Sequence, residues 1–227
     1  MLLKLINKKE VANQIKELRF KPDKKVDFMP GQFLMFKHNI NGKMEKRAYS
    51  IASSPLSAHI GVILKIYPDG KMSKIFEKLK IDDSIEADGP FGVFKYDNQH
   101  KNVVLLAGGT GIAPFMGFIR YIIEKKHDAN IILIYSCKTE SDIICYEELK
   151  NFQKNNIKVV ITLTQQKDNW TGHKGRISKE LIIDNVHDIN DYVFYLCGPN
   201  EMTDYTYKLL NSDLGIDKSR IKRESWG

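Results

Sequence analysis

The sequence has few of the residues that build metal centres. It contains only three cysteines, Cys137, Cys145 and Cys197, and no two of them are spaced as CxxC. Three cysteines cannot form a four-cysteine zinc or iron–sulfur site, and no nearby histidine has the spacing of a mixed site. We therefore expect no bound metal, and any redox centre of this chain would be organic.

Long apolar runs and a concentrated block of charge are also missing. No run of about 20 apolar residues exists, and the apolar stretch of the N-terminal MLLKLINKKE is too short for a signal peptide. We therefore expect a soluble, cytoplasmic protein without a membrane span. The 35 Lys and Arg outnumber the 28 Asp and Glu by 7, but they are scattered and form no arginine-rich arm. Nucleic-acid binding is not expected, and an acidic partner, anionic ligands or simple solubility can each account for the charge.

The 227 residues suit two domains of about 100 residues each, which we place at 1–98 and 99–227. Short strand-like runs broken by Pro, Gly, Asn and Asp predict an antiparallel β-barrel or sandwich in the first half, with one helix near 73–79. Its expected strands are 14–20, 33–37, 47–51, 60–66 and 84–87.

The second half alternates short apolar runs with helical patterns. The expected strands are 103–107, 131–135, 158–164 and 192–196, and the expected helices are 113–125, 145–155, 178–184 and 201–214. Strands that alternate with helices predict an α/β doubly wound parallel sheet, with ligands outside the carboxyl ends of the strands.

A glycine-rich turn, LAGGTGIAP, follows the first of these apolar runs. A strand that feeds a helix through glycines leaves backbone N–H groups free at the helix start, which favours a phosphate. No lysine follows the glycines, which argues against a P-loop and hence against a kinase or ATPase. The dinucleotide pattern GxGxxG fits at Gly109 and Gly111 but has Pro114 at its third glycine, so the turn predicts a variant dinucleotide site.

A second segment, RAYSIASS, covers 47–54. Along a strand, Arg47 and Tyr49 project to one face and Ser50 to the other. Arginine suits a phosphate and tyrosine a flat ring, whereas the alternative is an ordinary ladder of polar surface residues.

Six segments in order resemble the ferredoxin-NADP reductase superfamily, in its two-domain form without an iron–sulfur domain. RAYSIASS resembles the flavin motif RxYSxxS; the others are PGQF (30–33), DGKMS (69–73), GPFGVF (89–94), GGTGIAP (108–114) and CGPNEM (197–202). The resemblance runs from about Pro30 to the C-terminus. It implies a Greek-key flavin-binding barrel followed by an NAD(P)-binding domain whose C-terminal tail returns to the flavin. Asp82 departs from the family, because many members have glycine there.

Three residues are implied to tune hydride transfer. Ser50 would hydrogen-bond near flavin N5, and Cys197 would lie beside the nicotinamide. Glu224, two residues before Trp226, matches the acidic residue and the aromatic with which family members often end. A frayed tail is the alternative for this C-terminus.

A larger set is implied to hold the flavin. Residues 70–73 would open a short helix whose N-terminus binds a pyrophosphate, which favours FAD over FMN, although Ser73 could be an ordinary N-cap. The full set is Arg47, Tyr49, Ser50, Ser53, Leu64, Lys65, Ile66, Gly70, Lys71, Met72, Ser73, Thr110 and Trp226.

The glycine turn and the CGPNEM segment are implied to hold NAD(P). Lys138, after the second strand, could accept a 2′-phosphate, but the loop 164–167 offers no arginine, so NADH and NADPH stay open. The full set is Gly108, Gly109, Thr110, Gly111, Lys138, Cys197, Gly198, Pro199 and Met202.

The implied activity is that of an NAD(P)H-dependent flavoprotein reductase. Hydride would pass between NAD(P)H and FAD, and electrons between FAD and a small acidic carrier protein such as ferredoxin or flavodoxin, which the net charge could steer. One alternative is a flavin reductase or diaphorase that acts on small molecules. The other is a non-catalytic nucleotide-sensing subunit, since one fold serves many functions.

Overall fold

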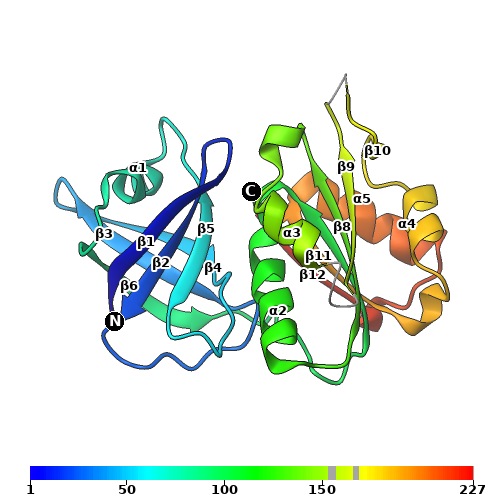
Figure 1. Cartoon of the computed structure of the whole chain (residues 1–227), viewed down its shortest axis with the longest axis horizontal. Coiled ribbons are helices and arrows are strands. Elements are labelled where there is room, and N and C mark those ends of the chain that lie inside the picture. The colour runs from blue at the N-terminus through cyan, green and yellow to red at the C-terminus, as the bar shows by residue number, and fades with distance from the viewer. Residues whose placement is uncertain (153–156, 166–168, 227) are drawn as a thin grey trace. The chain divides into compact units, whose positions relative to one another are not determined.

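The structure, a computed structural model, describes residues 1–152, 157–165 and 169–226, with the side chains of all of these except Trp226. It contains two compact units: Met1–Tyr96 with Ala113–Lys125, and Asp97–Ile112 with Lys126–Gly227 (Figure 1). The boundary predicted at 98/99 stays a prediction. The end of the helix expected at 145–155, and Gln166 and Lys167 of the loop considered for NADPH, lie outside the described residues.

The first unit is built on an antiparallel sheet of six strands in the order β4-β3-β6-β1-β2-β5. The strands are β1 (Leu2–Ala12), β2 (Ile15–Pro22), β3 (Phe33–Ile40), β4 (Lys43–Ser50), β5 (Ile60–Lys65) and β6 (Ser84–Phe91). Directly after β4, Ile51 bridges to Val62 of β5, and the N–H of Ala52 donates to the carbonyl of Gly61. These contacts join the two outer strands, so the predicted barrel is confirmed.

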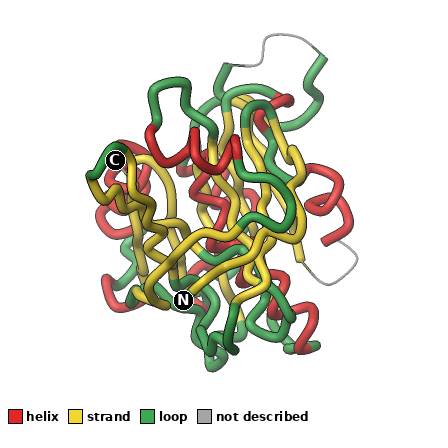
Figure 2. The backbone as a smooth tube through the Cα atoms, turned by 90° about the vertical axis from the view of Figure 1, so that its left-hand side faces the viewer, coloured by secondary structure: helices red, strands yellow, loops and turns green. Residues whose placement is uncertain are grey.

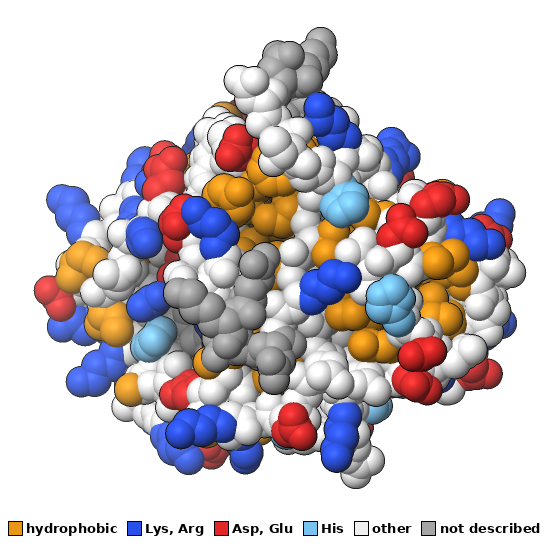
Figure 3. All heavy atoms as spheres, turned by 45° about the vertical axis from the view of Figure 1, so that its right-hand side comes forward, with side chains coloured by type: hydrophobic (Ala, Val, Ile, Leu, Met, Phe, Trp, Pro, Cys, Tyr) orange, Lys and Arg blue, Asp and Glu red, His pale blue; other side chains and the backbone are white. Residues whose placement is uncertain are grey.

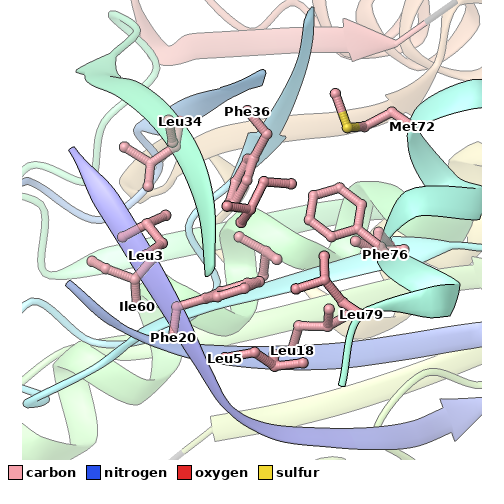
Figure 4. Close-up of a cluster of buried hydrophobic side chains, with 14 of the residues drawn as sticks. Leu3, Leu5, Leu18, Phe20, Leu34, Phe36, Ile60, Met72, Phe76 and Leu79 are labelled. Carbon is pink, nitrogen blue, oxygen red and sulfur yellow. The ribbon is translucent and has the colours of Figure 1, made fainter. Parts of the chain in front are cut away.

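The barrel interior is filled by alternating apolar residues. Leu3 and Leu5 of β1, and Leu34 and Phe36 of β3, are fully buried at a spacing of two, as expected for strands with one inward face (Figure 4). The strands curve around this interior, as the yellow tubes in Figure 2 show. Full burial of each such side chain contributes about 1.5–3 kcal/mol, before the entropy of ordering it is counted.

Helix α1 (Lys71–Lys78) packs on this core through Met72, Phe76 and the residue after its end, Leu79. It begins two residues before the predicted helix start. Lys8 of β1 reaches its C-terminal end, where Nζ donates to the carbonyls of Phe76, Glu77 and Leu79. The helix is therefore fixed by apolar contacts along its length and by a cation at its negative end.

The position at which many family members have glycine, Asp82 in this chain, lies in the turn after α1. Asp82 has a φ of +76°, a conformation that favours glycine, and its N–H donates to the carbonyl of Leu5. Its carboxylate lies 2.8 Å from Nζ of Lys4. The departure at Asp82 therefore falls in a turn, as the sequence suggested.

The second unit contains a parallel sheet of six strands in the order β10-β9-β8-β7-β11-β12. The strands are β7 (Asn102–Gly108), β8 (Asn130–Cys137), β9 (Ile157–Leu163), β10 (His173–Lys174), β11 (Val193–Pro199) and β12 (Ile221–Trp226). The chain winds outward from β7 in one direction and from β11 in the other. The predicted doubly wound sheet is confirmed, and its strand order reverses between β7 and β11.

Helices connect these strands. α2 (Ile112–Lys125) follows β7 through a short turn of 3-10 helix at Gly109–Gly111, and the other helices are α3 (Tyr146–Phe152), α4 (Lys179–Asn185) and α5 (Asn200–Lys208). One alternative from the sequence is wrong: the C-terminus is no frayed tail, because 221–226 form β12, the sixth strand of the sheet. Among the described residues, none of the helices is long and apolar enough to cross a membrane.

Candidate functional site

In the barrel unit, the end of β4 presents the residues of the RAYS segment. Arg47 is exposed, and its guanidinium forms no ion pair or hydrogen bond with the rest of the described chain. The ring of Tyr49 packs edge-on against Phe36 and Phe76, at centroid distances of 5.8 and 5.2 Å. Burial raises the pKa of Tyr49 to about 12, so its hydroxyl keeps its proton at neutral pH. Ser50 is buried on the opposite face of the strand.

Helix α1 lies on the same side as Tyr49, because it supplies Phe76. Its N-cap is Gly70, which has no side chain to cap the first turn, and a Cβ there would lie 2.3 Å from Oγ of Ser73. Ser73 therefore is not the N-cap that the alternative reading expected: its Oγ accepts from the N–H of Tyr67 and lies within hydrogen-bond distance of the carbonyls of Tyr67 and Gly70. The first turn of α1 is left with N–H groups available to an anion.

Lys71 links this helix to β4. Its Nζ lies 2.7 Å from Oε1 of Glu45, and this hydrogen bond is the main cause of the lowered pKa of Glu45. Glu45 and Arg47 share a face of β4 because they are two residues apart. The structure thus brings Arg47, Tyr49 and the start of α1 together.

Four other predicted flavin residues bury their side chains for structural reasons. Leu64, Ile66 and Met72 belong to the barrel core, and Oγ of Ser53 accepts from the N–H of Gly61 at 2.9 Å. Lys65 is half-buried, with Nζ over the ring of Tyr67. Their contacts with a flavin stay predictions.

In the second unit, the glycine turn lies at the point where the strand order reverses. A Cβ on Gly111 would lie 2.2 Å from the carbonyl oxygen of Cys197, and a Cβ on Gly108 would lie 2.4 Å from Sδ of Met202. A Cβ on Gly198 would lie 3.1 Å from the N and Cα atoms of Gly108. The backbone of Cys197 and Gly198 therefore leaves no room for a side chain at Gly111, whereas Gly109, with a φ of +52°, has nothing within 4 Å of its Cβ position.

Next to this turn, Cys197 and Glu224 lie side by side. The register pairs Cys197 of β11 with Ala107 of β7 and with Glu224 of β12, so the three side chains share one face of the sheet. Cys197 is fully buried. On the opposite face, Arg223 forms an ion pair with Asp204 of α5 at 2.9 Å.

The carboxyl group of Glu224 is partly buried, and the described residues offer no hydrogen-bond donor to one of its oxygens. Oε2 is buried without a hydrogen-bond partner among the residues that the structure describes, and burial raises the pKa of Glu224 to about 7. A buried oxygen without a donor is costly and fits a ligand that brings one, such as the carboxamide of nicotinamide.

The remaining predicted nucleotide residues lie at strand ends. Thr110 is half-buried in the turn, and Pro199 is the N-cap of α5. Lys138 is exposed after β8. The next residue, Thr139, forms a reciprocal capping pair with Asp142. Trp226 pairs through its backbone with Pro199, and its side chain is outside the described atoms.

Comparison with known proteins shows the family to which the chain belongs. A family model described as an oxidoreductase FAD-binding domain matches residues 2–96, and one described as an oxidoreductase NAD-binding domain matches residues 105–208. NADH-cytochrome b5 reductase 1 of Candida albicans is 32% identical over 226 residues, which cover 95% of this chain and 76% of that protein. NADH-cytochrome b5 reductase 1 of Mortierella alpina is 36% identical over 83% of this chain.

Solved structures share the fold. The FAD/NAD-binding domain of nitric oxide dioxygenase from Vibrio cholerae superposes with a TM-score of 0.90 at 20% identity, covering 100% of this chain and 98% of that chain. Ferredoxin-NADP+ reductase from Plasmodium falciparum gives 0.83 at 22% identity, covering 99% and 96%. The chain spans 65% of the Mortierella protein and 56% of the electron transfer component of 2-halobenzoate 1,2-dioxygenase from Burkholderia cepacia, to which it is 30% identical.

The chain belongs to the ferredoxin-NADP reductase superfamily. It carries the FAD-binding and the NAD-binding domains of that family, and both cofactors predicted from the sequence are confirmed. The residues present fit these cofactors, because each unit offers uncompensated groups: Arg47 and the start of α1 in one, and the glycine turn with Glu224 in the other. The roles of individual residues stay predictions.

Proposed function

We propose that this chain is an NADH-dependent FAD flavoprotein that delivers electrons to a small acidic carrier protein. The observation that carries the proposal is the pairing of Cys197 with Glu224 on neighbouring strands beside the glycine turn. Among the described residues, Oε2 of Glu224 is buried there without a hydrogen-bond partner. A nucleotide-sensing subunit has no need of this arrangement, because binding alone requires only the turn. A bound FAD would supply the redox chemistry that links hydride transfer from the nicotinamide to electron transfer to an acceptor.

The chain's own residues would bind and orient the two cofactors. Arg47 and the first turn of α1 supply positive charge and N–H donors to a pyrophosphate. Tyr49 offers a phenolic hydroxyl that is protonated at neutral pH, and burial raises its pKa further, to about 12. Glu224 would accept a hydrogen bond at Oε2 or hold a proton there near neutral pH, because its pKa is about 7.

NADH is favoured over NADPH by the residues after β8. Lys138 is the single cation there, and it is followed by two acidic residues, Glu140 and Asp142. Negative charge repels a 2′-phosphate, whose charge is close to −2 at neutral pH. The names of the Candida and Mortierella relatives, both NADH reductases, support the same choice.

The distribution of charge favours a protein acceptor. The barrel unit holds 20 Lys and Arg against 12 Asp and Glu, a net charge of +8, whereas the other unit holds 15 against 16, a net charge of −1. The positive charge therefore resides in the flavin-binding unit, although on the face shown in Figure 3 both signs are interspersed. An acidic ferredoxin or flavodoxin would be attracted to that unit; the relatives named for cytochrome b5 and for a dioxygenase also point to protein acceptors.

The first test is an anaerobic titration of the FAD-loaded protein with NADH and with NADPH, followed by visible absorbance. We expect rapid bleaching by NADH at lower concentration than by NADPH. Bleaching by neither would refute the reductase function and favour the sensing subunit. The acceptor is tested next, with an acidic ferredoxin, a flavodoxin and free flavin compared at low and high salt. Turnover that falls with salt for a carrier protein supports the proposal, and salt-independent turnover confined to free flavin supports the small-molecule reductase.

A further inference from the structure

The barrel unit contains a buried ion pair that none of the proposed cofactor contacts uses. Glu17 of β2 is 3% exposed, and its Oε1 lies 2.7 Å from Nη1 of Arg120 on α2. Its second oxygen, Oε2, lies 3.0 Å from Nη2 of Arg19, a more exposed residue. A buried carboxylate persists only when it is paired, so Glu17 fixes the position of Arg120.

Arg120 in turn holds the segment that follows Ser50. The same Nη1 donates to the carbonyl of Ala52 at 2.8 Å. One turn earlier on α2, a Cβ on Gly117 would lie 2.7 Å from the carbonyl oxygen of Ile51. The helix therefore contacts residues 51–52 in two ways. Its backbone packs closely against Ile51 because Gly117 has no side chain, and the charged guanidinium of Arg120 donates a hydrogen bond to Ala52.

The helix that makes these contacts begins at the nucleotide turn. α2 starts at Ile112, directly after Gly111, and runs without interruption through Arg120. With a rise of about 1.5 Å per residue, Gly117 is about 8 Å and Arg120 about 12 Å along the axis from Ile112. A single stiff element thus joins the turn to the segment that carries Ser50.

We propose that Arg120, held by Glu17, is a positioning residue that couples nucleotide binding at the glycine turn to flavin binding at the RAYS segment. The inference rests on the proposed function, since it takes FAD and a nicotinamide dinucleotide as the two ligands. A nucleotide that orders the start of α2 fixes Gly117 and Arg120, and through them the backbone after Ser50. Each ligand then strengthens the binding of the other by the same factor.

The test uses ADP-ribose in place of NADH, because ADP-ribose has no nicotinamide ring and cannot stack on the flavin. FAD affinity is measured by quenching of flavin fluorescence and ADP-ribose affinity by calorimetry, each with and without the other ligand. We expect bound FAD to tighten ADP-ribose binding at least about five-fold in the wild type, and the reverse by the same factor. Arg120→Met is expected to reduce this coupling factor below about two.

Arg19→Met is the matched control. It removes a positive charge from the same carboxylate, and the Arg19 guanidinium pairs with Glu17 and not with the backbone of residues 51–52, so the wild-type factor should persist. If Arg120→Met does not fold, Glu17→Gln combined with Arg120→Met leaves no unpaired buried charge. Gly117→Ala disturbs the second contact independently and should also lower the factor.

The outcomes separate the two proposals. A wild type that binds both ligands with a coupling factor of one overturns the coupling and leaves the proposed function intact, as does an unchanged factor in the folded Arg120 variants. If Arg19→Met lowers the coupling factor as much as Arg120→Met does, the loss is due to charge alone, and the proposed coupling through Arg120 is also overturned. A wild type that binds neither FAD nor ADP-ribose refutes the proposed function itself.

Discussion

Replacing Glu224 by Gln tests the uncompensated carboxyl group beside Cys197. Burial raises the pKa of Glu224 from the ordinary 4.5 to about 7, and no other cause contributes. Between these two values the folded state keeps a proton that the unfolded state has lost. The folded state then binds more protons, so the free energy of unfolding falls as pH rises from about 4.5 to 7 and is level above that.

The size of this change in the free energy of unfolding follows from the pKa shift of Glu224. A difference of about 2.5 pKa units at about 1.36 kcal/mol per unit sets an upper limit of about 3.4 kcal/mol. The side chain is half-buried, so solvent screening reduces the effect to about 1–2 kcal/mol. Glu224→Gln removes the ionisation, so above pH 7 the variant should be more stable than the wild type by this amount, with the advantage vanishing near pH 4.5.

Urea unfolding of the flavin-free proteins from pH 5 to 9 measures this difference. Other titrating groups are common to both proteins and cancel in the comparison. Glu201→Gln, an exposed residue at the start of α5, is the control and should leave the pH profile unchanged. A stability difference between the Glu224 variant and the wild type that stays constant with pH would refute the reasoning.

Three further predictions follow from the contacts described above. Lys8→Met removes the hydrogen bonds to the end of α1 and should lower the free energy of unfolding by about 1–3 kcal/mol in urea, whereas Lys9→Met, at an exposed neighbour, should change it by less than about 0.5. Gly111→Ala places a Cβ 2.2 Å from the carbonyl of Cys197 and should weaken ADP-ribose binding at least about ten-fold in calorimetry, a loss of about 1.4 kcal/mol, with FAD affinity unchanged. Ser50→Ala should slow flavin reduction by NADH in stopped-flow more than it lowers FAD affinity; equal reduction rates would remove Ser50 from the mechanism.

The sequence predicted the elements whose signals are local. Strand alternation and the glycine turn depend on neighbours within a few residues, and both sheets are of the predicted class, although β1, β10 and β12 were not among the expected strands. The start of α1 moved to Lys71 because the extended Gly70 serves as N-cap, leaving Ser73 to bond the chain before the helix.

Long-range contacts were beyond sequence reasoning. The hydrogen bond from Arg120 to Ala52 joins residues 68 positions apart in the sequence, and the hydrogen bond from Lys8 to Phe76 spans the same separation. Nothing in the local sequence marks either cation as different from other surface lysines and arginines. The placement of Glu224 next to Cys197 likewise depends on the parallel register of β12, which the C-terminal hexapeptide alone does not specify.

The bridge from Ile51 to Val62 also bears on how the chain avoids aggregation. It joins the chain directly after β4, one outer strand of the sheet, to the other outer strand, β5, and open outer strands are where sheets of different molecules pair. The parallel sheet protects its own edges differently. β10 has only two residues, His173 and Lys174, and β12 exposes Lys222 and Arg223. Short length at one edge and positive charge at the other oppose the addition of a foreign strand.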